Sequence, residues 1–567
     1  MKRTINIIFV TALILLSTSV PAFSLDDETH YTTEPLVVGL NDAYSPFRKV
    51  FVSPDEDPIV GFTKKVGSQE LLAFDQILVS ITYLKAAAEN PDREVREDYN
   101  ERALATLRMC TSYLKDPYSR QRNGTVEFYS LGLQEDSYTR SPRLARDQAL
   151  LLWALDLALD FIDPELPLYT RYSDIIQSIW SFLDEDFYDS TFGGWFTKLT
   201  PVSTTEVATD TSKRLADNSL IMLALLETNA SRLGITDTIL QERVSSSLLF
   251  FKNHYKVGQG MASLGVRDGS VVSSDTYFAK DNALYGLASL KYFEKTQDGT
   301  FLTEAKNSWS FLVDKLWEEG FGGVFGGANQ FGDPIIAGKS LEDQVYFSLL
   351  SVRLGAYGGL ADGYLDYFLQ TDKIIKLRFK ENTYIFASAD RKLYTSNELY
   401  IRAAAFAHYY FLETPHLVGV GTPREAIVGQ AVKTEVYVRT IPNVPLNITF
   451  TSDVDFEQKS ILVNNSSTIR LDLQFGNNIK AGYHDILGTV LLRKVKIQDI
   501  TLEVNMKANV RIPSGLLYLV GAAVLAGVII VVRYPPNWLK ERLNELNLSD
   551  SVNPPNPSYP IQEDDDQ

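Results

Sequence analysis

A dipeptide of aspartate followed by asparagine or glutamine recurs at the start of apolar, helix-forming stretches. It opens RDQALLLWALDLAL at Asp147, DNSLIMLALLE at Asp217, DNALYGLASL at Asp281 and DQVYFSLLSV at Asp343. Successive copies lie 70, 64 and 62 residues apart, which is the length of two helices with two connections. Each unit is therefore predicted to be a helical hairpin, and a chain of such hairpins limits the folds that can enclose the apolar helices.

Two looser copies extend the series to six apolar helices. Asp75 lies 72 residues before Asp147, and Asn397 lies 54 residues after Asp343. More amphipathic helices are predicted between them, near residues 91–115, 170–185, 236–255, 301–318 and 361–379. A helix that is apolar on most of its circumference must be enclosed, whereas a helix with one apolar stripe can lie outside. The sequence thus predicts a mainly α protein with an (α/α)6 toroid over residues 68–413. Five outer helices accompany six inner ones, and residues 25–67 form an N-terminal extension.

The connections between these helices are unequal in length. Connections from an inner to an outer helix are short, as at EKTQDGTF, whereas the returning ones are long, as at TFGGWFTKLTPVSTTEVATDTSKR. The long loops therefore gather where the inner helices begin, and long ordered loops on a rigid scaffold commonly carry binding sites. Two of them are copies, with Gly193-Gly194-Trp195-Phe196 in one and Gly322-Gly323-Val324-Phe325 in the other.

Beyond residue 413 apolar and polar side chains alternate with a period of two, as in KTEVYVRT and STIRLDLQF. Residues 414–512 are predicted to form a small immunoglobulin-like β-sandwich. Residues 1–24 have the basic start, apolar run and small residues of a signal peptide. Residues 515–532 carry no charge over 18 positions, which predicts a single transmembrane helix.

Basic residues after this span, such as Arg533 and Lys540, place the C-terminus in the cytoplasm. The bulk is then expected to be extracellular on the plasma membrane, with a disordered cytoplasmic tail at residues 533–567. Sequons in an extracellular chain predict a glycoprotein. They lie at Asn123, Asn229, Asn447, Asn464 and Asn465.

Composition excludes several functions. The net charge of −17 argues against a nucleic-acid partner, because there is no basic surplus to neutralise phosphates. Five histidines do not cluster, so neither a metal site nor another cofactor is predicted. Cys110 is the single cysteine, which rules out a disulfide within the chain.

The stretch FYDSTFGGWFTKL followed by KRLADNSLIMLALLE resembles the N-acylglucosamine 2-epimerase group of the six-hairpin glycosidase superfamily, and LEDQVYFSLLSV is similar to a helix in thioredoxin-fused relatives of that group. The resemblance covers roughly residues 68–412. It implies an (α/α)6 barrel with a sugar-sized pocket and a carbohydrate substrate. The epimerases of this group use a pair of histidines in the pocket. None of the histidines here falls at the start of an inner helix, which argues against epimerisation.

Glycoside cleavage requires one carboxylic acid to protonate the leaving oxygen and one carboxylate on the opposite face of the sugar. Asp217 and Asp281 are the preferred catalytic pair, with Asp343 and Asp147 as further candidates. Polar and aromatic side chains beside them are predicted to bind substrate, because sugar rings stack on aromatic rings. These are Asn218, Asn282, Glu342, Trp195, Phe196, Tyr277 and Phe325.

A structural interpretation competes at each position. An aspartate in the first turn stabilises a helix start, the neighbouring amide can tie neighbouring inner helices together, and aromatics beside paired glycines can anchor a loop. Two functions therefore stay open. One is a membrane-anchored, carbohydrate-active enzyme of glycosidase type. The other is a non-catalytic surface protein that binds glycan or a protein partner through the mouth of the toroid.

Overall fold

The computed structural model describes residues 29–33, 40–51, 59–115 and 142–507, apart from short interior stretches. Those stretches are residues 69, 202–206, 258–259, 272–275, 321, 330, 337, 359–362, 381–385, 388–392, 395–400, 424, 453, 455 and 477–478. None of the helices in the described ranges combines the length and the apolar character needed to cross a membrane. The predicted signal peptide, transmembrane helix and tail, together with Asn123 and Asn397, lie outside the described residues and stay predictions.

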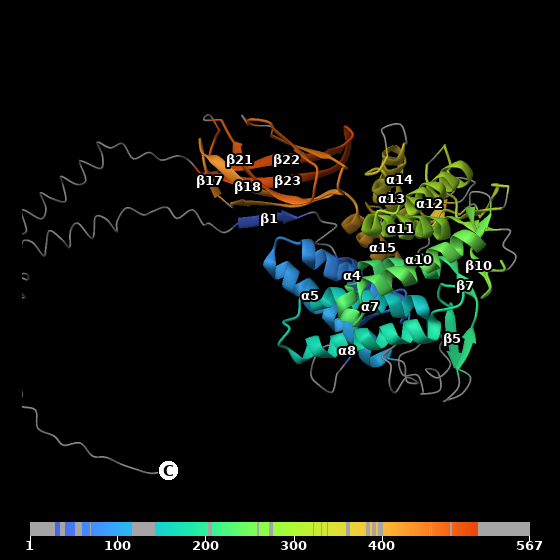
Figure 1. Ribbon diagram of the computed structural model, residues 1–567. Helices are drawn as coiled ribbons and strands as arrows, with labels where there is room; N and C mark the ends of the chain where they lie inside the picture. Colours follow the sequence, from blue (N-terminus) through green and yellow to red (C-terminus); the bar gives the residue numbers. More distant parts are fainter. Residues whose placement is uncertain are drawn as a thin grey trace, which may run out of the picture. The chain divides into compact units, whose positions relative to one another are not determined.

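An inner ring of helices forms the centre of the helical region (Figure 1). It consists of α4 (Ala73–Glu89), α7 (Ala145–Leu159), α9 (Leu215–Glu227), α11 (Ala279–Thr296), α13 (Leu341–Leu354) and α15 (Ile401–Glu413). Each of these helices packs against the next, and α15 packs against α4, so the ring closes. Their residues are buried on nearly all sides, as the apolar patterns predict.

An outer helix follows each of the first five inner helices in sequence and packs on it. They are α5 (Arg93–Arg108), α8 (Pro167–Phe182), α10 (Asp237–His254), α12 (Gly299–Phe311) and α14 (Tyr364–Lys380). Three of them continue into a π-helical turn, at η2 (Met109–Tyr113), η3 (Leu183–Phe187) and η5 (Leu312–Leu316). A short 3-10 turn, η4 (Ala230–Leu233), joins α9 to α10. The outer helices bury one stripe each, which is the amphipathic pattern that the sequence predicts.

The N-terminal extension takes the place of a twelfth helix between α15 and α4. It contains α3 (Leu40–Tyr44), η1 (Ser45–Phe47) and a hairpin of β2 (Arg48–Phe51) and β3 (Ile59–Phe62). The buried ring of Tyr44 meets Tyr83 of α4 and His408 of α15 edge-on, each at a centroid distance of 5.3 Å. Asn41 donates a hydrogen bond to Asp98 of α5. A compact segment with large side chains therefore covers this seam without a full helix.

Two sheets make up the region after α15. One has the order β1 (Thr29–Thr33), β16 (His416–Pro423), β18 (Ala431–Arg439) and β21 (Ser467–Gln474). The other has the order β17 (Glu425–Ile427), β23 (Val495–Lys507), β22 (Gly482–Leu492), β19 (Leu446–Ser452) and β20 (Lys459–Val463). Alternate residues of β18 are buried, as in a sandwich strand. Strand β1 comes from the N-terminal extension and pairs antiparallel with β16, which the sequence did not predict.

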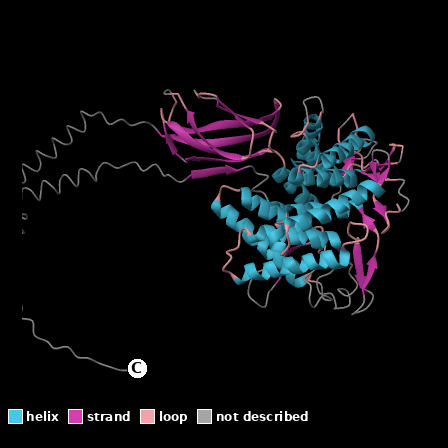
Figure 2. Cartoon of the chain, viewed as in Figure 1, coloured by secondary structure: helices cyan, strands magenta, loops and turns pink. Residues whose placement is uncertain are grey.

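The long loops before the inner helices form short strands at one end of the helices (Figure 2). They are β4 (Arg143–Leu144) with β5 (Lys198–Pro201) and β6 (Val207–Asp210), β7 (Lys213–Arg214) with β10 (Leu264–Gly265), β8 (Lys256–Val257) with β9 (Gly260–Met261), β11 (Tyr277–Phe278) with β12 (Gly327–Ala328) and β13 (Pro334–Ile336), and β14 (Phe386–Ala387) with β15 (Leu393–Tyr394). These strands connect loops of neighbouring hairpins, for example β7 with β10. The loop-rich end is therefore ordered by its own backbone hydrogen bonds.

If Tyr44 closes the ring, its truncation will destabilise the whole helical region. We expect Tyr44→Ala to lower the free energy of unfolding by about 3–5 kcal/mol, the usual cost of removing a buried aromatic ring. Tyr44→Phe keeps the ring contacts and is the matched control, with a smaller expected loss. Chemical denaturation followed by circular dichroism measures both. An alanine variant as stable as the wild type would show that the seam needs no cover.

Candidate active site

Side chains that face the lumen follow a regular spacing along the inner helices. Positions three and six residues after the aspartate of the repeat line the lumen, as Leu78 and Ile81 do on α4 and as Leu220 and Leu223 do on α9. The position ten residues after it carries charged groups such as Glu227. Spacings of three and four residues keep a side chain on one helix face, so the rings of successive helices stack as layers. The lumen is therefore apolar in its middle and charged at the end opposite the loops.

A cavity of about 60 Å³ remains inside these layers. This volume is small, because small-molecule pockets usually measure about 300–1,000 Å³. Three aromatic residues bound it toward the helix N-termini. Phe406 lies 6.0 Å from Phe74 and 5.6 Å from Tyr346 between ring centroids. A sugar ring does not fit below these aromatics, so we expect a ligand to bind above them. We call this end, where the inner helices begin, the mouth.

An ion-pair network lies at the opposite end of the lumen. Arg353 of α13 pairs with Glu413 of α15 at 2.7 Å, Lys85 of α4 pairs with the same carboxylate, and Lys291 of α11 pairs with Glu227 of α9 at 2.7 Å. Burial alone would raise the pKa of Glu413, but the charges of Lys85 and Arg353 hold it well below its usual range. Each pair joins two inner helices, so we assign this network to stability.

Charged side chains from five inner helices meet at the mouth. The residues concerned, which we call the mouth cluster, are Arg146, Asp217, Lys280, Glu342 and Arg402. Arg146 of α7 pairs with Asp217 of α9 at 3.1 Å, and Lys280 of α11 pairs with Glu342 of α13 at 3.1 Å. Arg402 of α15 pairs with Asp75 of α4 at 2.6 Å. The structure thus brings the sequence-predicted Asp217 and Glu342 together with three cations that the sequence did not single out.

The repeated aspartates occupy the third residue of their helices, not the capping position. Their contacts tend to cross to the preceding inner helix, as when Asp343 accepts a hydrogen bond from the backbone N–H of Lys280 at 3.1 Å. Asp147 is buried and pairs with its neighbour Arg146 at 2.9 Å. The aspartates therefore do not share one chemical setting, although they share one repeat position.

Three of these acids, Asp75, Asp281 and Asp343, hold their protons more tightly than usual because burial raises the pKa of each. Burial raises the pKa of Asp281 to about 6, and the nearby charges of Asp217 and Glu342 add to the rise. Burial raises the pKa of Asp343 to about 7, against a hydrogen bond from Ser340 that lowers it. Asp281 is 8% exposed, whereas the Asp217 side chain is 13% exposed and paired with Arg146. The predicted pair thus consists of a proton-holding acid and a salt-bridged carboxylate within electrostatic range of each other.

The amides that follow the aspartates hold the loops. The side chain of Asn218 accepts a hydrogen bond from the N–H of Trp195 at 2.6 Å and donates to the carbonyl of the same residue at 2.9 Å. Asn282 makes the same two contacts with Met261, at 2.8 and 3.3 Å. Gln344 makes them with Val324 and Gln76 with Phe62. We call this two-point contact the amide clasp. Because Asn218 and Asn282 are fully buried in it, their role here is structural.

The paired glycines leave room for the amide clasp. Gly193, Gly194, Gly322 and Gly323 all have φ between 74° and 83°, a region that other residues rarely adopt. A Cβ atom on Gly323 would lie 2.5 Å from the Oε1 atom of Gln344. Both the conformation and the space at this position therefore require glycine.

The predicted aromatic contacts are largely turned inward. Trp195 is fully buried against Tyr188, at 5.2 Å between ring centroids, and Tyr277 is buried against Phe311. Phe196 is buried, and Phe325 is partly buried. In this arrangement Trp195 and Tyr277 anchor loops and offer little surface for a sugar to stack on.

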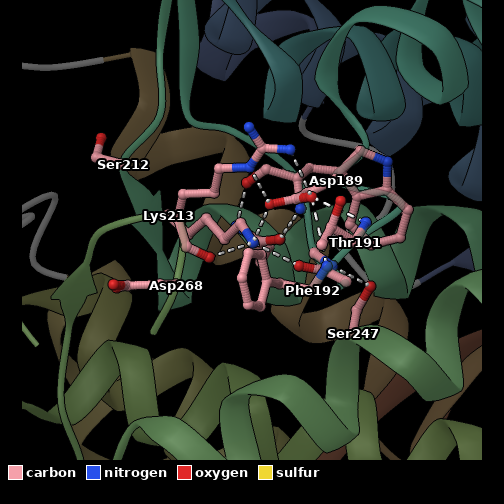
Figure 3. Close-up of polar contacts among 12 residues, drawn as sticks. Asp189, Thr191, Phe192, Ser212, Lys213, Ser247 and Asp268 are labelled. Atoms are coloured by element: carbon pink, nitrogen blue, oxygen red, sulfur yellow. Dashed lines mark hydrogen bonds and ion pairs between the residues drawn. The ribbon is translucent and has the colours of Figure 1, made fainter. Parts of the chain in front are cut away.

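A buried lysine fixes each glycine loop, which the sequence analysis missed. Lys213 bonds Asp189 at 3.0 Å and the carbonyl of Gly193 at 2.7 Å, and lies 4.0 Å from the ring centroid of Phe250 (Figure 3). Burial would raise the pKa of Asp189, but hydrogen bonds from Lys213 and Thr191 hold it below the usual value. The second copy repeats this, because Lys339 bonds Glu318 and the carbonyl of Gly322.

A sequence signal for these lysines does exist. Lys213 and Lys339 each lie four residues before the repeated aspartate, at Asp217 and Asp343. The spacing does not identify the groups that these lysines bind. A buried lysine is tolerated only when an acid and carbonyl groups surround it, and those groups come from other parts of the chain.

The histidines lie away from the lumen. His408 packs on Tyr44, and His254 packs on Phe250 at 5.0 Å between ring centroids. Among the described residues, neither the lumen lining nor the mouth cluster contains a histidine. The expected departure from the epimerases therefore holds for this part of the chain.

The amide clasp predicts a large effect of a small truncation. Asn218→Ala would leave the N–H and carbonyl of Trp195 buried without these partners, and each unpaired group costs about 1–3 kcal/mol. We expect a loss of about 2–5 kcal/mol in the free energy of unfolding. Asn464→Ala, at an exposed turn of the sandwich, is the control and should stay within about 0.5 kcal/mol. Equal stability of the two variants would contradict the clasp.

Asp343 predicts a pH dependence of stability. Its pKa rises from 3.8 to about 7 on folding, so its contribution is full below pH about 4 and is lost as the pH rises toward 7. In Asp343→Asn, unfolding free energy relative to the wild type should rise with pH over this range, by up to about 1.4 kcal/mol per pH unit. Denaturant titrations from pH 4.5 to 8 measure the difference. A difference that does not change with pH would show that Asp343 is ionised throughout.

Solved structures with a similar fold include a D-mannose isomerase, which is 14% identical over 70% of this chain and 100% of its own length, with a TM-score of 0.52. A cellobiose 2-epimerase from Bacillus thermoamylovorans B4167 is 10% identical over 66% of this chain and 95% of its own, with a TM-score of 0.51. A sugar epimerase from a ruminal bacterium is 10% identical over 66% and 97%, also at 0.51. No family model and no curated protein sequence matches the chain. At these identities the likeness shows the fold alone, and it agrees with the predicted (α/α)6 toroid.

Proposed function

We propose that this chain is a sugar-processing enzyme, and specifically a glycoside hydrolase whose reaction centre lies at the mouth. The observation that carries the proposal is the pairing of Asp281, with a pKa of about 6, and the salt-bridged Asp217. A carboxyl group with a raised pKa beside a second carboxyl group is the usual arrangement of a general acid and its partner.

In this mechanism each carboxyl group has one task. Asp281 donates its proton to the glycosidic oxygen while the bond from that oxygen to the anomeric carbon breaks. The carboxylate of Asp217 supports the positive charge that develops at the anomeric carbon, and Arg146 keeps it in place through the 3.1 Å contact. A water molecule then forms the new bond to the anomeric carbon and gives a proton back to Asp281. Asp343 and Asp147 have no catalytic role in our proposal. Ser340 and Lys280 hold Asp343, and Arg146 holds Asp147.

The cellular setting belongs to the same proposal. A signal peptide at residues 1–24 and a span at residues 515–532 would anchor the enzyme in the plasma membrane with the mouth outside. Support for this comes from the sequence pattern alone. Protease accessibility of the sandwich on intact cells tests it, since an extracellular sandwich is cleaved without lysis.

Turnover of a glycan panel by the purified full-length chain tests the chemistry. Asp217→Asn and Asp281→Asn should each lower kcat/KM by about 10²–10⁴-fold, the usual contribution of a positioned acid or base. Asp472→Asn, an exposed change on the sandwich, is the matched control and should leave turnover unchanged.

Leaving-group chemistry identifies the acid. Because a nitrophenol leaves without protonation, Asp281→Asn should lose much less activity on a nitrophenyl glycoside than on an unactivated glycan. The wild-type rate should also fall above pH about 6, where Asp281 loses its proton, and this limb should be absent in Asp281→Asn. Full turnover in both aspartate variants would sink the assignment. Glycan binding with no turnover by the wild type would favour the non-catalytic alternative.

A further inference from the structure

The mouth presents cations more openly than acids. Arg146, Lys280 and Arg402 have side chains that are 19%, 30% and 36% exposed. Most of the neighbouring carboxyl groups are buried, at Asp75, Asp147, Asp281 and Asp343. A ligand that enters the mouth therefore meets three cations, together with Asp217 and Glu342 as the more accessible acids.

The cations keep unused hydrogen-bond donors. Arg402 contacts Asp75 through Nε, and Arg146 contacts acids through Nε and Nη1. Among the described residues, no acceptor forms a hydrogen bond with either Nη atom of Arg402 or with Nη2 of Arg146. A guanidinium group has five N–H donors in a planar fork, and that fork matches a carboxylate.

One aromatic ring holds both guanidinium groups. Arg146 lies 4.7 Å and Arg402 lies 4.6 Å from the ring centroid of Phe74. Cation–π contact orients each group and keeps the two like charges near each other, although they repel. An anion between or above them would relieve this repulsion. The N-termini of the inner helices also point to this end, which favours negative charge.

We propose that the sugar recognised at the mouth carries a carboxylate, as a uronic acid does, and that Arg402, Arg146 and Lys280 bind it. This inference rests on the proposed function, because it names the substrate class of the same site. A carboxylate fits better than a neutral sugar, because the N–H donors that the ion pairs leave unused on Arg146 and Arg402 lie in a planar fork that matches it. The chain's net charge of −17 repels anions at long range, so the preference has to arise from these local contacts.

Binding of an oligogalacturonide and of its methyl ester to the full-length chain tests the proposal. The ester has nearly the same shape but no charge. Titration calorimetry should show the acid binding at least about tenfold more tightly than the ester, and raised salt should reduce the preference. A sulfated neutral oligosaccharide is the third probe. Equal binding of acid and ester, or tighter binding of the sulfated sugar, would overturn the carboxylate assignment.

Variants connect the preference to the named residues. Arg402→Gln and Lys280→Gln should each reduce the acid-to-ester ratio severalfold, and Arg402→Lys should retain part of it because the charge stays while the fork is lost. The double variant Asp75→Asn with Arg402→Gln removes both members of the buried ion pair, so that no charge is left buried without its partner. A melting temperature close to that of the wild type then shows that any loss of binding is not caused by misfolding. Arg470→Gln, exposed on the sandwich, is the control. An unchanged ratio in both single variants would contradict the proposal.

Failure of this inference and failure of the proposed function give different results. Uronate binding that persists in Asp281→Asn, without turnover of any glycan by the wild type, removes the hydrolase and keeps the acidic ligand. Hydrolysis of neutral glycans with no preference for the acid over the ester keeps the hydrolase and removes the acidic ligand.

Discussion

The contact on which the loop-rich end depends is the amide clasp. A single asparagine or glutamine side chain satisfies the N–H and the carbonyl of one residue in the preceding loop, as Asn218 does for Trp195. The short strands pair parts of these loops through their own backbone, but backbone groups outside those strands are costly when they are buried and unpaired. The clasp supplies partners for such groups from the rigid inner ring. It therefore sets the position of the glycine turn, which in turn sets the carbonyl of Gly193 that the buried Lys213 binds.

Much of this architecture was predictable, because its information is local. Burial around a helix is recorded in the apolar run of each inner helix, and alternation of helix direction places all long loops at one end. The closure of the ring by Tyr44 and the pairing of β1 with β16 were not predictable. Both bring together residues that are far apart in the sequence, and no short pattern names the partner of such a segment. The same holds for Asn218, since the partners of an amide depend on the direction of a backbone that sequence does not give.

The lumen explains why the mouth, and not the barrel interior, is the place to look for chemistry. Apolar layers fill the middle, and ion pairs around Glu413 occupy the other end. The cavity of about 60 Å³ that remains between the layers is small for a sugar ring. At the mouth, by contrast, charged groups are partly exposed and already oriented by Phe74 and by one another.

Repetition of the aspartate first suggests that no single copy is special, but the structure separates the copies. The residue before the aspartate can reach the next inner helix, as Arg146 does, but a cation there does not outweigh burial at every copy, since Lys280 lies beside Asp343 and the pKa of that acid is still raised to about 7. Asp217 follows a helix with Arg146 at that position and is salt-bridged. Asp281 follows a helix with Ala216 there, which offers no cation, so burial leaves its pKa at about 6. An asparagine in place of Asp281 would be neutral at every pH, so it would not lower the free energy of unfolding as the pH rises. A titrating acid is therefore the less stable solution near neutral pH at both Asp281 and Asp343, and what distinguishes Asp281 in our proposal is its place beside Asp217.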